Sequence, residues 1–224
     1  MDWTAVLVSV KLAAATTTVL LVAGLPLAYW LAYSPFRFKF LIEAIVSLPL
    51  VLPPTVLGFY VLTAISPANP VGRLYADLTG APLPFTFSGL LIGSVLYSLP
   101  FAVQPFCSAF AAVDQRLIEA SWSLGVDRVG TFRRVILPLS VRGVTTGVVL
   151  SFAHTLGEFG VVLMIGGNLP GSTRTVSISI YDSVQALDFA RAGTTSAFLL
   201  AISFIVLATT YALQRSPWPI RTTP

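Results

Sequence analysis

The sequence predicts an all-α, polytopic membrane protein with five transmembrane helices, and three observations carry this fold class. The 224 residues are 55% hydrophobic and only 10% charged, and the mean hydropathy is +0.85, which is too apolar for an ordinary soluble domain. The apolar residues gather in stretches of about 20 residues or more, the length that a helix needs to cross the hydrocarbon core. The 13 lysines and arginines fall between these stretches without forming a basic patch, which excludes a nucleic-acid partner.

Five stretches reach the required length, and we interpret them as the spans of one transmembrane domain that covers residues 1–224. No internal repeat or low-complexity tract divides the chain. The polar residues between the third and fourth stretches, 114–142, form a separate loop. The five predicted spans cover residues 12–33, 40–65, 87–113, 144–165 and 192–213.

The first two spans are joined by a tight turn from Ser34 to Lys39, and the second contains an unusual density of prolines. Prolines remove helical hydrogen bonds, so the run LPLVLPPTVLG predicts a kink or break. Counted from Phe40, Pro53 and Pro54 lie about 20 Å deep, near the midplane. A broken helix at this depth can line a transport path, with Thr55 as a hydroxyl donor; a purely structural kink is the alternative.

The fourth span carries the only histidine, His154, and a well-embedded carboxylate, Glu158. The two are four residues apart, so they share a helix face and can pair. Ionisable groups within the hydrocarbon usually face an interior or a water-filled path, and Ser151 lies on the same span. A neutral pair that locks this span to its neighbours is the alternative. A loop of 26 residues, Gly166 to Arg191, precedes the fifth span and is expected to be functional or disordered.

Lysine and arginine prefer cytoplasmic loops, and their distribution here predicts the orientation of the chain. With the N-terminus outside and the C-terminus inside, nine of the 13 basic residues lie on the inner side and four on the outer side. The polar loop 114–142 is then cytoplasmic. The inner residues are Arg37, Lys39, Arg116, Arg128, Arg133, Arg134, Arg142, Arg215 and Arg221, and the outer ones are Lys11, Arg73, Arg174 and Arg191.

Loop 114–142 has the pattern of two short amphipathic helices. Asp114 can cap the first helix and Gly125 can end it. The second helix is expected from about Asp127 to Ile136, where Pro138 would end it at the membrane. Taken alone, this composition is equally compatible with a protruding helix pair and with a pair that lies on the lipid headgroups.

The spacing within this loop resembles the coupling-loop signature of ABC importer permeases, which is Glu-Ala-Ala, three residues, Gly, nine residues, Ile, one residue, Leu-Pro. Two departures, Ser for Ala and Val for Ile, are conservative. The signature stands here as Glu119, Ala120, Ser121, Gly125, Val135, Leu137 and Pro138.

This resemblance implies a type I importer permease whose loop is a coupling helix seated in a cleft of a cytoplasmic ABC ATPase dimer. No Gly-Lys-Ser/Thr phosphate-binding loop occurs in the chain, so we expect a non-catalytic subunit. The ATP and Mg²⁺ would be used by the partner, and this chain would bind no cofactor or metal of its own.

Three segments together, LPLVLPPTVLG (48–58), SFAHTLGEFG (151–160) and GNLPGSTRT (167–175), resemble the molybdate branch of the family. Members of that branch tend to carry Arg where this chain has His154. The resemblance implies a homodimer in the bacterial inner membrane, supplied by a periplasmic or lipid-anchored molybdate-binding protein. That protein would dock on the two outer segments, Ser66 to Thr86 and Gly166 to Arg191. These segments include Arg73, Arg174 and Arg191.

Three alternatives to a molybdate permease remain open at this point. Sulfate, thiosulfate or tungstate is an alternative cargo, and the sequence does not separate molybdate from tungstate. A proton-coupled secondary transporter using His154 and Glu158 would take up its substrate without ATP. An intramembrane scaffold would carry no cargo at all.

Overall fold

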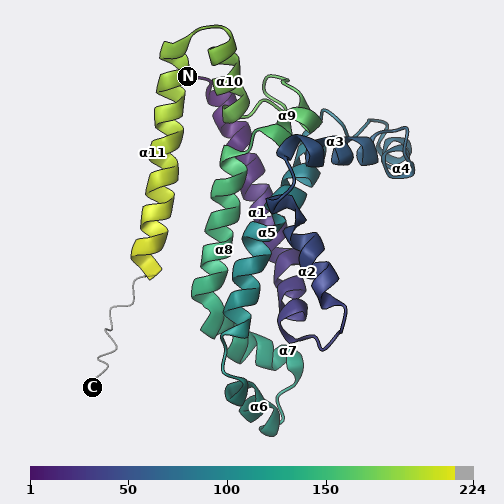
Figure 1. Ribbon diagram of the computed structural model, residues 1–224, viewed down its shortest axis with the longest axis vertical. Coiled ribbons are helices and arrows are strands. Elements are labelled where there is room, and N and C mark those ends of the chain that lie inside the picture. The colour runs from purple at the N-terminus through teal and green to yellow at the C-terminus, as the bar shows by residue number, and fades with distance from the viewer. Residues whose placement is uncertain (215–224) are drawn as a thin grey trace.

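The all-α class is as predicted, and the computed structural model describes residues 1–214 (Figure 1). Arg215 and Arg221, which were assigned to the inner side, lie outside the described residues. The elements are α1 (Trp3–Tyr33), α2 (Lys39–Ser47), the 3-10 turn η1 (Leu48–Leu50), α3 (Pro54–Ile65), α4 (Pro70–Thr79), α5 (Phe87–Ala111), α6 (Gln115–Ser123), α7 (Arg128–Thr131), the π turn η2 (Phe132–Ile136), α8 (Leu137–Gly157), α9 (Gly160–Gly166), α10 (Val176–Gln185) and α11 (Phe189–Gln214).

Four helical segments of the described chain are long and apolar enough to cross a bilayer, and a bent pair brings the total to five. The four are α1, α5, the continuous segment Arg128–Gly157 and α11. The bent pair joins Lys39–Leu50 to Pro54–Ile65 at an angle of 112°. Each predicted span lies on one of these elements, except that the third extends two residues past the end of α5 and the fourth extends past the end of α8 into α9.

Helices α1, α5 and α8 form the central bundle, in which α8 approaches α5 closely at two glycines (Figure 1). A Cβ atom at Gly143 would lie 2.3 Å from the Cβ of Ala109, and one at Gly147 would lie 2.5 Å from the ring of Phe106. Phe106 and Phe110 are fully buried at this contact. Since α5 leads into loop 114–142 and α8 leads out of it, this packing fixes both ends of the loop.

The second span breaks completely at its prolines, where the sequence predicts a kink or break. Pro53 is extended, with φ −54° and ψ 135°, and Pro54 begins α3. A residue that precedes proline disfavours the helical conformation, so two successive prolines end one helix and start the next. Helix α3 therefore turns away from α2 and runs sideways toward α4 (Figure 1).

The expectation that Pro138 ends the second loop helix is wrong. Helices α7, η2 and α8 run on as one segment from Arg128 to Gly157. In the π turn the N–H of Leu137 donates to the carbonyl of Phe132, five residues back. This wider turn carries the helix past Pro138, which has no N–H of its own and sits in the first turn of α8, where proline is tolerated.

The segment from Gly166 to Arg191 is more ordered than a long loop. It contains the two-and-a-half-turn helix α10, whose N-cap Thr175 accepts the N–H of Ile178. The N–H of Val176 donates to Ser9 Oγ on α1 at 2.8 Å, which fastens the start of α10 to the bundle. The apolar pattern in this segment extends over too few residues to distinguish a surface helix from a loop.

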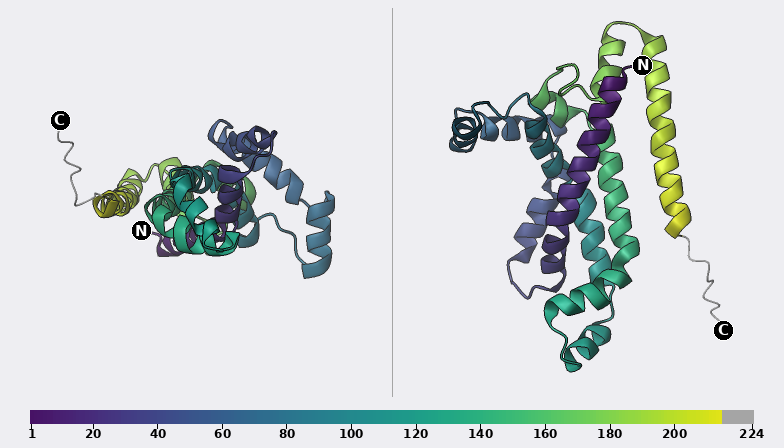
Figure 2. Two further views of the ribbon diagram at one scale, coloured as in Figure 1. Left: turned by 90° about the horizontal axis from the view of Figure 1, so that it is seen from below. Right: turned by 180° about the vertical axis from the view of Figure 1, so that it is seen from behind.

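The two ends of the bundle have different character. The two ribbon views place α6 and α7 at one end and the N-terminus, α9 and α10 at the other (Figures 1 and 2). Helix α11 descends beside the bundle and stands apart from it over most of its length (Figure 2). The polar loop 114–142 and the cluster of short helices thus lie at opposite ends of the bundle.

Candidate functional site

Helix α6 is held at both of its ends. Asp114 caps its start by accepting a backbone N–H with its carboxylate. At its end Gly125 has φ +78°, its N–H donates to the carbonyl of Trp122 at 2.9 Å, and the N–H of Val126 donates to that of Ser121 at 3.1 Å. These two bonds form a Schellman motif, which needs a left-handed residue and therefore favours glycine. The turn at Gly125 thus has a defined geometry.

Helices α6 and α7 are joined by a buried pair of hydroxyls. Ser121 Oγ and Thr131 Oγ1 lie 3.0 Å apart, and these residues are 7% and 1% exposed. Asp127 caps α7 by accepting the N–H of Gly130 at 3.1 Å. Ser121, which stands where the signature has alanine, therefore has a structural role, because its hydroxyl joins α6 to α7.

The loop has one face toward the bundle and one free face. Ile118 is buried in the cluster that contains Ile136 and the rings of α5. Glu119, Ala120 and Gly125 are exposed, and Leu124 is 83% exposed at the tip. An exposed apolar tip with a rigid turn is suited to bind a partner protein.

The last three residues of the signature lie at the root of the loop. Val135 and Leu137 are half-buried and Pro138 is exposed, at the junction of η2 with α8. Because α7, η2 and α8 are continuous, a displacement of α7 is transmitted directly to the transmembrane helix.

We expect Ser121→Ala to loosen this helix pair, because the buried Thr131 hydroxyl would lose its partner at a cost of about 1–3 kcal/mol. Amide exchange over residues 115–131 should accelerate by about tenfold. Ser123→Ala is the matched control, since that hydroxyl is exposed and bonds within its own helix. Adding Thr131→Val to Ser121→Ala should restore part of the protection; equal exchange in both serine variants would contradict the assignment.

The second part of the candidate site, after loop 114–142, is the contact between the two broken spans. A Cβ atom on Gly160, the first residue of α9, would lie 2.7 Å from the Cβ of Pro54, the first residue of α3. One turn further along α3, a Cβ on Gly58 would lie 2.8 Å from the Cβ of Met164. Helices α3 and α9 can therefore pack this closely only because both positions are glycine.

His154 is enclosed by residues of α5. Its ring stacks on Phe101 at 3.9 Å between centroids and lies 4.7 Å from the ring of Tyr97. Its Nδ1 is 3.0 Å from Ser98 Oγ, which also contacts Thr155 Oγ1 at 2.9 Å. His154 is thus positioned by two aromatic rings and a shared hydroxyl.

Glu158 does not form the predicted pair with His154. Helix α8 ends at Gly157, and no ion pair or hydrogen bond joins Glu158 to His154 among the described residues; the two groups lie against different serines of α5, Ser94 and Ser98. The carboxyl is 4% exposed, and neither of its oxygens has a hydrogen-bond partner among the described residues. Both ion pairs of the described chain involve Arg174. A buried, unpaired carboxyl at a helix break is unusual for a purely structural residue.

The other predicted path residues are not brought together. The hydroxyl of Ser151 donates to the carbonyl of Val148 in its own helix, at 3.0 Å. Pro53 is exposed at the break before α3, and Thr55 is exposed in the first turn of α3. The structure thus contains two separate contacts. Pro54 packs against Gly160 at the start of α9, and His154 packs against residues of α5.

Sequence reasoning missed the α5 partners of these groups. Ser94 lies beside the Glu158 carboxyl, Ser98 bonds His154, and Phe101 stacks on it. Ser94 and Ser98 are four residues apart, so they share one face of α5. Two hydroxyls at helical spacing inside an apolar run were the signal that could have identified this face.

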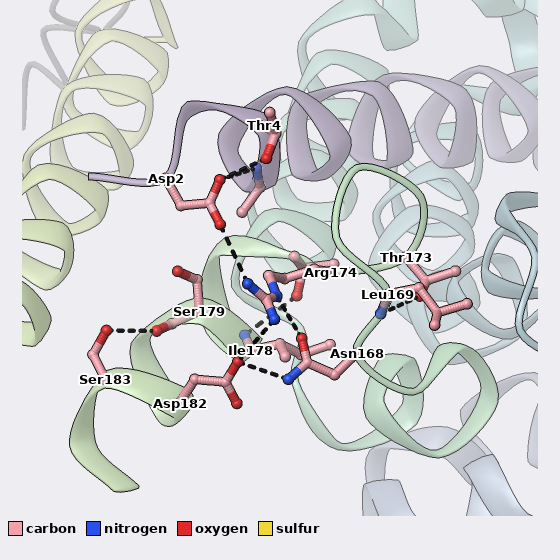
Figure 3. Close-up of polar contacts among 12 residues, drawn as sticks. Asp2, Thr4, Asn168, Leu169, Thr173, Arg174, Ile178, Ser179, Asp182 and Ser183 are labelled. Atoms are coloured by element: carbon pink, nitrogen blue, oxygen red, sulfur yellow. Dashed lines mark hydrogen bonds and ion pairs between the residues drawn. The ribbon is translucent and has the colours of Figure 1, made fainter. Parts of the chain in front are cut away.

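Arg174 is the centre of a polar cluster at the end of the bundle that holds the N-terminus, shown in Figure 3. Its guanidinium donates to Asn168 Oδ1 and forms ion pairs with Asp2 at 3.8 Å and Asp182 at 3.5 Å. Asn168 in turn donates to Asp182 at 2.6 Å. The cluster ties the N-terminus to α10 and to the turn before it. Of the predicted docking residues, only Arg73 and Arg191 are exposed.

We expect this cluster to survive at neutral pH and to loosen only in acid. The hydrogen bond from Thr4 and the charge of Arg174 hold the pKa of Asp2 below its ordinary value of 3.8. A lowered folded-state pKa contributes stability above the unfolded value, and this stability is lost as the pH falls through the folded value. The melting temperature of the wild type should therefore exceed that of Asp2→Asn at about pH 7, and the difference should shrink as the pH falls below the ordinary pKa of 3.8 and through the lowered folded-state pKa. A difference that persists unchanged in acid would contradict this role.

The comparisons with known proteins agree with the geometry. Residues 24–216 match the family described as binding-protein-dependent transport system inner membrane component. The chain is 48% identical over 214 residues to the molybdenum transport system permease protein ModB of Azotobacter vinelandii, covering 96% of this chain and 95% of that protein. It is 33% identical over 210 residues to a probable sulfate transport system permease protein of Chlorella vulgaris, covering 94% and 79% of the two chains.

The fold is also found among solved structures. A chain from the crystal structure of a bacterial alginate ABC transporter, in complex with an alginate-bound periplasmic protein, superposes with a TM-score of 0.76. The match covers 95% of this chain and 77% of that one, at 16% identity. At this identity the likeness shows the fold and not the cargo.

Proposed function

This chain belongs to the family of binding-protein-dependent transport system inner membrane components, and we propose that its importer carries molybdate across the bacterial cytoplasmic membrane. One observation carries the choice of cargo: 48% identity to a molybdenum permease over nearly the full length of both chains. The sulfate relative is more distant, at 33% identity and with 79% of its length covered.

The proposed mechanism assigns the ATPase contact to loop 114–142. The exposed tip around Glu119, Gly125 and Leu124 would sit in a cleft of a cytoplasmic ATPase dimer, which binds and hydrolyses ATP with Mg²⁺. Closure of that dimer would move α6 and α7 as a unit, because Ser121 and Thr131 tie them together. The motion would pass along the continuous helix into α8 and rock the bundle between its inward-open and outward-open states.

The proposed gate is the contact between the two broken spans. Pro54 on α3 and Gly160 on α9 touch at the point where both helices change direction. A sliding of α8 would carry α9 with it and open or close this contact. Glu158 and His154 lie on the segment that would move, and their polar groups would line the route between the helices.

Selectivity would come from a periplasmic or lipid-anchored molybdate-binding protein that docks on the outer segments. The exposed side chains of Arg73 and Arg191 offer positive charge to that partner. Arg174 would contribute differently. Its charge is neutralised by ion pairs with Asp2 and Asp182, so it would hold the docking surface in shape.

The proposed assembly is a homodimer with the N-terminus outside and the C-terminus inside. Helix α11 stands apart from its own bundle and is largely exposed, with apolar side chains such as Leu200 and Phe204. A second copy could pack into that space. This orientation places α6 and α7 in the cytoplasm, where the ATPase is.

Reconstituted uptake tests the proposal. Proteoliposomes that contain this chain with its ATPase and binding protein should accumulate radiolabelled molybdate only when ATP is supplied inside. Excess unlabelled molybdate or tungstate should compete, and sulfate should not. Accumulation of labelled sulfate with no accumulation of labelled molybdate would overturn the cargo, and uptake that persists without the ATPase would overturn the ATP-driven mechanism in favour of proton coupling.

A further inference from the structure

An apolar groove runs along the lower half of α1 where α7 packs against it. The cavity is ≈ 440 Å³ in volume. Its α1 wall is formed by Leu21, Val22 and Leu25, and its other wall by Val129 and Phe132. Val22 is 71% exposed and Val129 is 62% exposed, so the groove is open to the surroundings of the bundle.

A second cavity of ≈ 400 Å³ adjoins the first and is more polar. Both cavities are lined by Tyr29 and Arg128. The second is also lined by Trp30 and Trp122, together with the amide of Gln115. Tryptophan and tyrosine gather at the level of the lipid headgroups, so this end of the groove lies at the membrane interface.

Arg128 stands where the two cavities meet, and its charge is not neutralised by the protein. It is exposed, and no carboxylate of the described chain lies within 4.0 Å of it, since both ion pairs belong to Arg174. The neighbouring Asp127 is directed to the backbone N–H of Gly130. An unpaired guanidinium at the interface favours a phosphate as its partner.

The length of the apolar wall matches one leaflet of a bilayer. From Tyr29 to Leu21 the helix rises about 12 Å, while half of the hydrocarbon core is about 15 Å thick. A soluble ATPase does not reach the depth of Leu21 and Val22. It would cover the tip of the loop around α6, which lies at the far end of the molecule from α9 and α10 (Figure 1).

We infer that this groove binds one anionic glycerophospholipid of the inner leaflet, with its phosphate at Arg128 and an acyl chain along Leu21, Val22 and Leu25. The inference rests on the proposed function only for its orientation, and it is independent of the cargo. The lipid would bridge α1 to α7 and so link the bundle to the helix that receives the ATPase. Anionic lipid would then stiffen the contact through which the two move together.

Native mass spectrometry of the full-length permease tests the site. The purified chain is equilibrated with mixed vesicles of phosphatidylglycerol and phosphatidylcholine, and the retained lipid is identified by mass. Arg128→Gln should reduce the preference for phosphatidylglycerol by about fivefold, which corresponds to roughly 1 kcal/mol per basic residue at an anionic surface. Arg133→Gln is the matched control, because that arginine is exposed on the same segment but lines neither cavity.

A second variant tests the acyl-chain half of the groove. Val22→Trp fills the apolar wall from an exposed position, so it should reduce the retention of both lipids without disturbing the core. Equal phosphatidylglycerol preference in the wild type and Arg128→Gln, or equal losses in Arg128→Gln and Arg133→Gln, would overturn the site. So would disulfide formation between two copies of Val22→Cys in a Cys107→Ala background, because the groove would then be occupied by a second chain. None of these readouts depends on transport, so a wrong cargo leaves the result intact.

Discussion

Replacing Gly125 with valine is expected to abolish ATP-driven uptake. Gly125 has φ +78°, which L-residues adopt at a cost of about 1–2 kcal/mol, and β-branched residues are disfavoured further. The Schellman motif would be lost, and with it the fixed direction of the chain between α6 and α7. We expect uptake to fall by at least about tenfold, together with the retention of the ATPase on the purified permease.

The control for this change lies at the same position. No atom lies within 4 Å of a Cβ placed on Gly125, so any loss comes from backbone strain and not from a clash. Asparagine tolerates the left-handed region, and Gly125→Asn should therefore retain most of the uptake. Gly193→Val makes the same substitution in open space on a helical backbone and should be mild. Full activity of Gly125→Val would refute the role of this turn.

Replacing Gly160 with valine should have a similarly large effect, through a different cause. Its Cβ would lie 2.7 Å from the Cβ of Pro54, and proline at the start of α3 is not free to move aside. Overpacking of this kind costs about 1–3 kcal/mol and would push α3 and α9 apart. If the contact of the broken spans is the gate, uptake should fall by about tenfold or more while the ATPase stays bound.

Gly157→Val is the matched control for the gate. Gly157 lies three residues earlier, at the end of α8, and a Cβ there meets nothing within 4 Å. The bond from Ser177 to Gly157 uses the backbone carbonyl and would remain. Uptake close to that of the wild type in Gly157→Val, with loss in Gly160→Val, separates the contact from a general effect on the helix break. Equal uptake in the two variants would remove the contact from the mechanism.

Local signals made most of the loop predictable from the sequence. Asp114 and Gly125 act within a few residues of their own positions, as cap and as left-handed stop, so their type and spacing were sufficient. The break at Pro53 and Pro54 was predictable for the same reason, because proline acts on its own backbone.

Features that depend on tertiary packing were not predictable. The break after Gly157 contains no proline, and the segment around Phe159 is as apolar as a continuous span. His154 and Glu158 do not pair because each lies against its own serine of α5, and the spacing within α8 does not report contacts from another helix. The contacts from α5, Ser98 to His154 above all, join residues 56 positions apart, and periodicity does not report such distances.

Site-directed crosslinking to the ATPase tests the central claim most directly. Leu124, which is 83% exposed at the tip of loop 114–142, is replaced by cysteine in a Cys107→Ala background and given a photoreactive thiol label. Leu78 on α4, which is 77% exposed and lies outside loop 114–142, receives the same treatment as the control. We predict that the label at position 124 crosslinks the ATPase and that the label at position 78 does not. The absence of a product from position 124, or equal products from both positions, would contradict the assignment of this loop as the element through which ATP drives transport.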